Sequence, residues 1–223
     1  SAGFDSFPKD TAGFLAMLKA LHAKGTPGGF ALGNATGDGL WTNWLIWSHG
    51  GQLVDKSNKV VIDSAETIKA LEYSKEMYAT LIPGTLSWLD PNNNKAFLDS
   101  QISLTNNGIS IYYATKNATD PKVQALKEDI QHASYPVGPV GVPTESHLFF
   151  NQMVMKYTKY PNAAKEFLRF MMEQEQFEAW ITGAGGYVAP PLADYTKTAI
   201  WTSDPKHTPY RDAVKNLRPA GYA

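Results

Sequence analysis

The chain has 223 residues, enough for one large domain or two small ones with a substantial buried core. Its 20 Lys and Arg residues nearly balance its 21 Asp and Glu residues, so there is no basic excess that would attract nucleic acid or an anionic membrane. The absence of cysteine excludes a disulfide framework, a thiolate metal site and a cysteine nucleophile.

Helices alternate with short apolar runs in the first third of the chain. The spacing of Phe14, Leu18 and Leu21 predicts a helix over 11–24 with these residues on its apolar face. Asp10 or Thr11 can cap it, and Gly25 ends it. Asp63 and Glu66 form a capping-box pattern for a later helix. The elements predicted after the first helix are a buried strand over 30–32, a glycine-rich loop over 33–39, a helix over 41–49, a hairpin over 53–62, and a helix over 63–81 with Ile68, Leu71 and Tyr78 facing inward.

The same alternation continues to the end of the chain and predicts an α/β architecture. A stretch rich in glycine and proline over 137–143 is the best candidate for a boundary between two lobes. The predicted elements are a helix over 92–99, a strand over 102–105, helices over 109–115 and 121–130, a strand over 152–157, a long helix over 161–182 with Ala164, Phe167, Leu168, Met171 and Met172 facing inward, and a last helix from Pro209.

Motifs of enzyme chemistry are missing from the sequence. The five histidines have no metal-ligand spacing, and no G-x-S-x-G or P-loop pattern is present. We therefore predict no catalytic residue, no metal ligand and no cofactor. Glycoside hydrolysis by paired carboxylates stays open as an alternative, with Asp38 and Asp90 as candidates, because such pairs are defined in space and not in sequence.

Aromatic and amide side chains cluster in patterns that favour binding. Trp44 and Trp47 are expected in the core, whereas Trp41 lies at a predicted helix start beside Asp38. Aromatic rings pack on sugar C–H faces, and carboxylate and amide groups pair with hydroxyls, so such a set suits a neutral polyol. The other candidates are Trp88 in a loop, Asn106 and Asn107 in the turn after a predicted strand, and Tyr112 and Tyr113 one helical turn later.

Several segments, in this order and spacing, together resemble family 1 of the extracellular solute-binding proteins. They are residues 29–33, 37–39, 44–47 and 50–51, then 61–67 and 70–72, then 96–98 and 102–108, and last 161–168. This family contains the sugar receptors of ATP-driven (ABC) importers, including maltose-binding protein.

The resemblance implies a type II periplasmic-binding-protein fold of two α/β lobes hinged around a cleft. It also implies that this chain is a fragment that lacks the amino-terminal segment of the first lobe. Residues 1–136 are then expected to form the second lobe, 137–197 the crossover with part of the first lobe, and 198–223 the return to the second lobe.

The resemblance also assigns binding roles to single residues of this sequence. Asp38 matches an acidic residue that touches sugar hydroxyls, and the turn at Asn107 matches one that lines the cleft. The aromatic platform that follows in the family is replaced here by Ser110. Glu145 and His147 match the hinge crossing and are expected to face the cleft.

The resemblance implies a binding protein and not an enzyme. We expect an exported, periplasmic and monomeric receptor that captures a solute, most simply a carbohydrate, and passes it to an ABC permease in the inner membrane. A glycoside-acting enzyme and a receptor of the same fold for a solute other than a sugar are the alternatives.

Overall fold

The computed structural model describes residues 2–33, 42–145, 152–188 and 190–216. The chain forms two compact units. Unit 1 comprises Ser1–His147 and Lys215–Ala223, and unit 2 comprises Leu148–Val214. Among the described residues, no helix is both long and apolar enough to cross a membrane. The lobe ranges that the resemblance implies stay a prediction.

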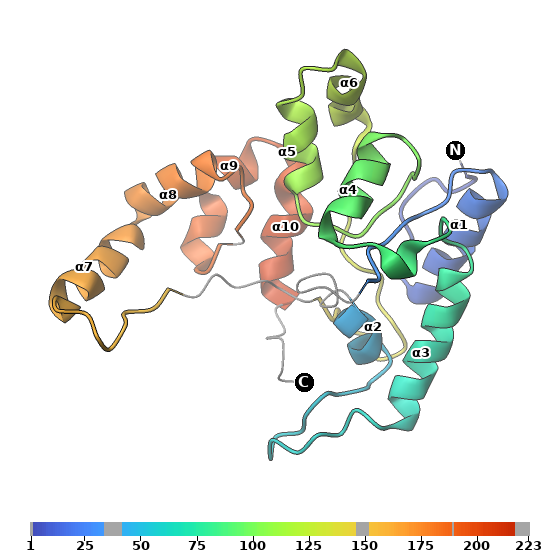
Figure 1. The fold of residues 1–223 in the computed structure, drawn as a ribbon, viewed down its shortest axis with the longest axis horizontal. Helices are drawn as coiled ribbons and strands as arrows, with labels where there is room; N and C mark the ends of the chain where they lie inside the picture. Colours follow the sequence, from blue (N-terminus) through green and yellow to red (C-terminus); the bar gives the residue numbers. More distant parts are fainter. Residues whose placement is uncertain (1, 34–41, 146–151, 189, 217–223) are drawn as a thin grey trace. The chain divides into compact units, whose positions relative to one another are not determined.

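The described residues of unit 1 up to Glu145 contain six α-helices and one short 3-10 helix (Figure 1). Their bounds are α1 Thr11–Ala23, α2 Thr42–Ser48, α3 Ala65–Tyr78, η2 Thr85–Ser87, α4 Asp90–Leu98, α5 Ser110–Lys116 and α6 Pro121–Asp129. Each α-helix lies within a few residues of its predicted range. The expected hairpin is also present, as an antiparallel bridge between Val54 and Val60.

Helix α1 follows its sequence signals closely. Asp10 caps it, accepting a hydrogen bond from Gly13 N at 2.7 Å, which satisfies one of the free N–H groups of the first turn. Phe14 and Leu18, one turn apart, are buried as predicted. The helix ends just before Gly25, whose φ of 74° suits glycine.

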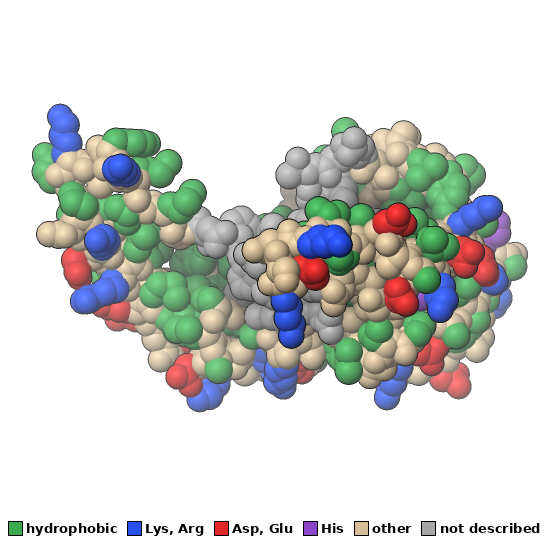
Figure 2. Space-filling view, turned by 90° about the horizontal axis from the view of Figure 1, so that it is seen from below, with side chains coloured by type: hydrophobic (Ala, Val, Ile, Leu, Met, Phe, Trp, Pro, Cys, Tyr) green, Lys and Arg blue, Asp and Glu red, His purple; other side chains and the backbone are tan. Residues whose placement is uncertain are grey.

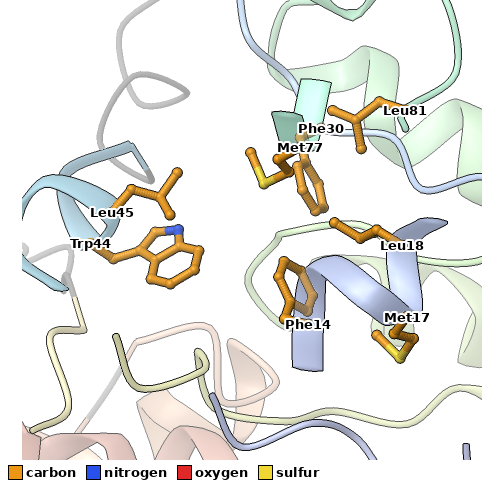
Figure 3. Close-up of a cluster of buried hydrophobic side chains, with 8 residues drawn as sticks. All are labelled: Phe14, Met17, Leu18, Phe30, Trp44, Leu45, Met77 and Leu81. Carbon is orange, nitrogen blue, oxygen red and sulfur yellow. The ribbon is translucent and has the colours of Figure 1, made fainter. Parts of the chain in front are cut away.

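A cluster of buried apolar side chains joins α1, α2 and α3 into the core of unit 1 (Figure 3). Trp44 is 1 % exposed and packs edge-on against Phe14, with ring centroids 6.4 Å apart. Trp47 is also buried, so the expectation that both tryptophans belong to the core is confirmed. The cluster consists of Phe14, Met17, Leu18, Phe30, Trp44, Leu45, Met77 and Leu81.

Three extended segments of unit 1 meet at Gly28. Gly28 forms parallel bridges to Leu81 and to Leu104, so its segment lies between the other two. Gly29 N donates to Leu104 O at 2.9 Å, and Ile82 N donates to Gly28 O at 2.9 Å. The three segments are therefore parallel, and their carboxyl ends lie at the same edge.

These segments do not lengthen into regular strands. The described residues contain isolated bridges and no named strand, so the strands expected over 30–32, 102–105 and 152–157 are wrong. The ladder stops in the central segment because Leu32 N donates to Thr85 O, inside the 3-10 turn η2, and not to a strand.

Helix α3 differs from the prediction in its cap and in its buried face. Ser64 caps it by accepting from Thr67 N at 3.1 Å, so the predicted capping box one residue earlier is wrong. Ile68 and Leu71, expected to face inward, are 54 % and 58 % exposed, and Tyr78 is also exposed. The buried residues on α3 are Thr67, Ala70 and Met77.

Helices are the only regular secondary structure among the described residues of unit 2, and residues 152–160 before the first of them are irregular. Its small core contains Phe177, Ile181, Tyr195 and Trp201. The last helix begins at Thr208, one residue before its predicted start at Pro209. The helices are α7 Pro161–Met171, α8 Gln174–Gly183, η3 Ala193–Lys197, α9 Ala199–Thr202, η4 Pro205–His207 and α10 Thr208–Ala213, and η5 Val214–Asn216 leads back into unit 1.

The long helix predicted from Pro161 is divided in two. Glu173 is extended, with ψ of 142°, and separates α7 from α8. No residue of α7 is buried, so the inward-facing stripe predicted there is wrong in this structure. Phe167 and Phe170 are 59 % and 45 % exposed, and Figure 2 shows hydrophobic side chains gathered on this part of unit 2.

Candidate functional site

The candidate site lies in unit 1, where the three extended segments end. Gly33 closes the central segment, and its N–H donates to Trp88 O at 2.8 Å. The third segment continues past Leu104 into the turn at Asn106 and Asn107. In α/β folds with parallel strands, the carboxyl ends of the strands are where ligands usually bind.

Trp88 is partly buried and packs closely on the central segment. A Cβ atom on Gly29 would lie 2.9 Å from Cζ3 of the Trp88 ring, so the ring rests directly on the backbone at Gly29. A Cβ atom on Gly33 would lie 2.3 Å from Trp88 O. Both glycines are therefore required for the close approach of the Trp88 loop.

A network of asparagine side chains holds the turn at Asn106 and Asn107. Asn93 Nδ2, on α4, donates to Asn106 O at 3.1 Å and to Thr105 Oγ1 at 3.2 Å. Asn107 Nδ2 donates to Asn94 Oδ1, also on α4. Helices α4 and α5 lie side by side, so the turn between the third segment and α5 is fixed against α4 (Figure 1).

Tyr135 connects this turn to the core. Its O–H donates to Asn106 Oδ1. Its ring stacks on Trp44, with centroids 4.9 Å apart and an angle of 13° between the planes. One side chain thus links a candidate binding residue to the best-buried tryptophan of unit 1.

The first turn of α5 carries three of the predicted binding residues, Ser110, Tyr112 and Tyr113. Ser110 Oγ lies 3.5 Å from Asn107 Oδ1 and extends the network. Tyr112 is 6 % exposed and packs edge-on against His132, whereas Tyr113 is partly exposed. Lys116 Nζ lies 4.8 Å from the centre of the Tyr112 ring, a cation–π distance.

The structure thus brings five of the predicted binding residues to one end of unit 1 and buries a sixth. Trp88, Asn106, Asn107, Ser110 and Tyr113 are partly accessible there, and Tyr112 is packed inside. Asp38, Trp41 and His147 lie outside the described residues. Whether any of the nine contacts a ligand stays a prediction.

A pocket of about 310 Å³ within unit 1 is lined in part by Tyr135. Its walls are mostly apolar, and one buried carboxyl group, Glu145, lines it. Burial raises the pKa of Glu145 above its ordinary value of 4.5, and hydrogen bonds from Asn216, Ser134 and the Tyr135 backbone oppose that shift. The lining residues are Phe7, Pro8, Lys9, Ala133, Ser134, Tyr135, Val137, Pro143, Glu145 and Asn216.

Sequence reasoning missed Asn93, Asn94 and Tyr135. The run Asn92–Asn94 was a usable signal, because asparagine is a poor helix former and rarely fills three successive helical positions without another role. No local signal marked Tyr135, whose partners are 29 and 91 residues away in the chain.

Metal chemistry has no support in the part of the chain that the structure describes. No group of three or more His, Cys, Asp or Glu side chains there is arranged to hold a metal ion.

The sequence matches the family model for "Bacterial extracellular solute-binding protein" over residues 2–209. No curated protein sequence matches the chain.

Solved structures of sugar receptors share the fold. The maltose-bound MalE3 of T. maritima is 20 % identical, with a TM-score of 0.69, over 97 % of this chain and 56 % of that one. The sugar-binding protein MalE of Xanthomonas citri is 15 % identical, with a TM-score of 0.75, over 99 % of this chain and 55 % of that one. The cyclic α-maltosyl-1,6-maltose binding protein of Arthrobacter globiformis is 18 % identical, with a TM-score of 0.68, over 100 % of this chain and 57 % of that one. The chain therefore spans little more than half the length of these proteins.

Proposed function

The chain belongs to the family of bacterial extracellular solute-binding proteins, and from that membership we propose that it is part of the substrate-binding receptor of an ABC importer. The receptor captures a carbohydrate in a cleft between two lobes and delivers it to a permease in the inner membrane. The type II periplasmic-binding-protein fold, with its α/β lobes, is the fold of its structural neighbours.

The observation that carries the proposal is the breadth of the match. The family model covers residues 2–209, and the similar structures cover nearly all of this chain. The proteins in those structures bind maltose or other sugars by their own descriptions. A neutral oligosaccharide is therefore the first ligand class to test.

The proposed ligand contacts combine the accessible site with the residues carried over from the family. Trp88, Asn106, Asn107, Ser110 and Tyr113 would form the side of the cleft that unit 1 contributes. Asp38, Trp41, Tyr112 and His147 complete the proposed set. Ring faces and amide groups in this combination suit the C–H faces and hydroxyls of a sugar.

The proposed receptor acts by closing and not by catalysis. Ligand contacts made from both lobes in the closed form shift the open–closed equilibrium toward that form, which the permease then recognises. The protein is proposed to be an exported, periplasmic monomer without enzymatic activity.

Calorimetric titration tests the proposal. The chain, and any longer natural form of it, is titrated with maltose and with longer neutral maltodextrins. Saturable binding without turnover is expected. Failure of every neutral oligosaccharide to bind would overturn the carbohydrate assignment. Hydrolysis of chromogenic glycosides that Asp38→Asn abolishes would show an enzyme instead of a receptor.

A further inference from the structure

The side-chain amide of Asn107 has one possible orientation. Gly108 N donates to Asn107 Oδ1 at 2.7 Å, and a backbone N–H can act only as a donor, so Oδ1 must face it. Ser110 Oγ donates to the same oxygen at 3.5 Å. Both lone pairs of Asn107 Oδ1 are therefore used within the turn.

The nitrogen of the Asn107 amide is oriented by a residue of α4. Asn107 Nδ2 donates one of its two hydrogens to Asn94 Oδ1. Among the described residues, its second hydrogen has no acceptor, so it is left for another group. The hydrogen-bonding capacity that Asn107 retains is thus that of a donor.

The side-chain oxygen of Asn106 also accepts a hydrogen bond, as that of Asn107 does. Tyr135 O–H donates to its Oδ1, and Asn93 Nδ2 donates to its backbone oxygen. Among the described residues, Asn106 Nδ2 has no partner, although the residue is partly accessible. Asn106 therefore adds N–H donors to those of Asn107.

Asn93 fixes the turn through its Nδ2, while its own side-chain oxygen makes no hydrogen bond with the described residues. Asn93 is 3 % exposed, and its Oδ1 is buried without a partner in the described part of the chain, while its Nδ2 bonds the turn. A buried unpartnered carbonyl oxygen is unfavourable and rare in folded proteins, and such atoms need an explanation. Fixing the backbone of the turn supplies one.

We propose that Asn93 and Asn94 are positioning residues that make the turn at Asn106 and Asn107 a hydrogen-bond donor site. The group that binds there is a hydrogen-bond acceptor, such as a hydroxyl, ring or glycosidic oxygen of the sugar. This inference rests on the proposed receptor function and specifies the polarity of one wall of its site.

A single-atom exchange tests the donor polarity. Asn106→Asp keeps an oxygen for Tyr135 O–H and removes the N–H donors, whereas Asn162→Asp adds the same charge at an exposed position of unit 2. With maltose as the neutral probe, Asn106→Asp should weaken binding about tenfold and Asn162→Asp less than twofold. Equal binding by wild type and Asn106→Asp would overturn the donor assignment.

A second pair of variants tests the positioning role without any ligand. Asn94→Leu removes the acceptor for Asn107 Nδ2, and Asn94→Asp restores one. In nitrogen–proton correlation spectra, the downfield, slowly exchanging Nδ2 proton of Asn107 should disappear in Asn94→Leu and return in Asn94→Asp. An Asn107 signal that is the same in all three proteins would overturn the positioning role.

The two experiments separate the two proposals. If neither maltose nor any longer neutral maltodextrin binds to the wild-type chain, the carbohydrate assignment fails, and the spectra alone decide whether α4 orients the turn. If maltose binds but the Asn94 variants leave the Asn107 signal unchanged, the receptor stands and the positioning role falls.

Discussion

Replacing Gly33 with alanine introduces one methyl group where the Trp88 loop crosses the central segment. The new Cβ would lie 2.3 Å from Trp88 O and 3.0 Å from Trp88 C. Carbon and oxygen atoms in ordinary contact lie more than 3 Å apart, and both atoms that collide belong to the backbone. Rotation of a side chain cannot relieve the clash, so the Trp88 loop must move.

The expected cost has two parts. Overpacking of a tight backbone contact costs about 1–3 kcal/mol. Movement of the loop also breaks the 2.8 Å hydrogen bond from Gly33 N to Trp88 O, which is worth about 0.5–1.5 kcal/mol. We therefore expect Gly33→Ala to lower the free energy of unfolding by about 2–4 kcal/mol.

Urea denaturation followed by tryptophan fluorescence measures this loss. Gly108→Ala is the matched control, because a Cβ atom there would have no neighbour within 4 Å. The control should stay within about 0.5 kcal/mol of wild type. If the two variants unfold at the same urea concentration, the close approach at Gly33 does not limit stability and the reasoning is refuted.

Three further substitutions probe the surroundings of the site. Tyr135→Phe removes the donor to Asn106 Oδ1 and should cost about 1 kcal/mol in urea denaturation, with the ring stack retained. Burial raises the pKa of Glu145 above 4.5, so the folded state binds the proton of this carboxyl group more tightly than the unfolded state does. The free energy of unfolding should therefore fall as pH rises through and above 4.5. Glu145→Gln should abolish that decrease, as thermal melts between pH 4 and 8 would show. Asp10→Ala removes the cap on Gly13 N and should cost about 1 kcal/mol, measured by the same denaturation.

Each of these has a contradicting result. Tyr135→Phe as stable as wild type would mean that its O–H is equally well solvated in the unfolded chain. A Glu145→Gln variant with the wild-type pH dependence would place the titrating group elsewhere. Asp10→Asn serves as the control for the cap, since asparagine also accepts from a helical N–H, and it should retain most of the stability.

Local signals predicted the parts of the fold that depend on neighbours in sequence. The cap at Asp10, the apolar spacing of Phe14 and Leu18 and the stop at Gly25 all act within one helix, and all are confirmed. The burial of Trp44 follows from its size and its helical spacing. The family resemblance added the fold, which the comparisons confirm.

Whether a helix face is buried depends on which other elements pack against it. The periodicity of apolar residues does not predict those elements. The spacing of Ile68 and Leu71 marks an apolar side of α3, yet Met77 is the α3 residue that packs in the core with side chains of α1 and α2. The stripe on α7 is genuine in sequence, but nothing in the described residues buries it.

The candidate site was predictable in its turn residues and not in its supports. Asn106 and Asn107 follow an apolar run, a local pattern typical of a loop at the end of a strand. Their partners Asn93 and Tyr135 come from elements separated from them by 13 and 29 residues, and such pairings appear only in the folded chain.

Unit 2 is inserted into unit 1, and this has a consequence for biosynthesis. Residues 148–214 form one uninterrupted stretch, so they can fold as soon as they leave the ribosome. Unit 1 is completed later, because the side chain of Asn216 reaches back 71 positions to Glu145. The core that α1, α2 and α3 form does not depend on this last contact, because every residue of that core precedes unit 2 in the chain.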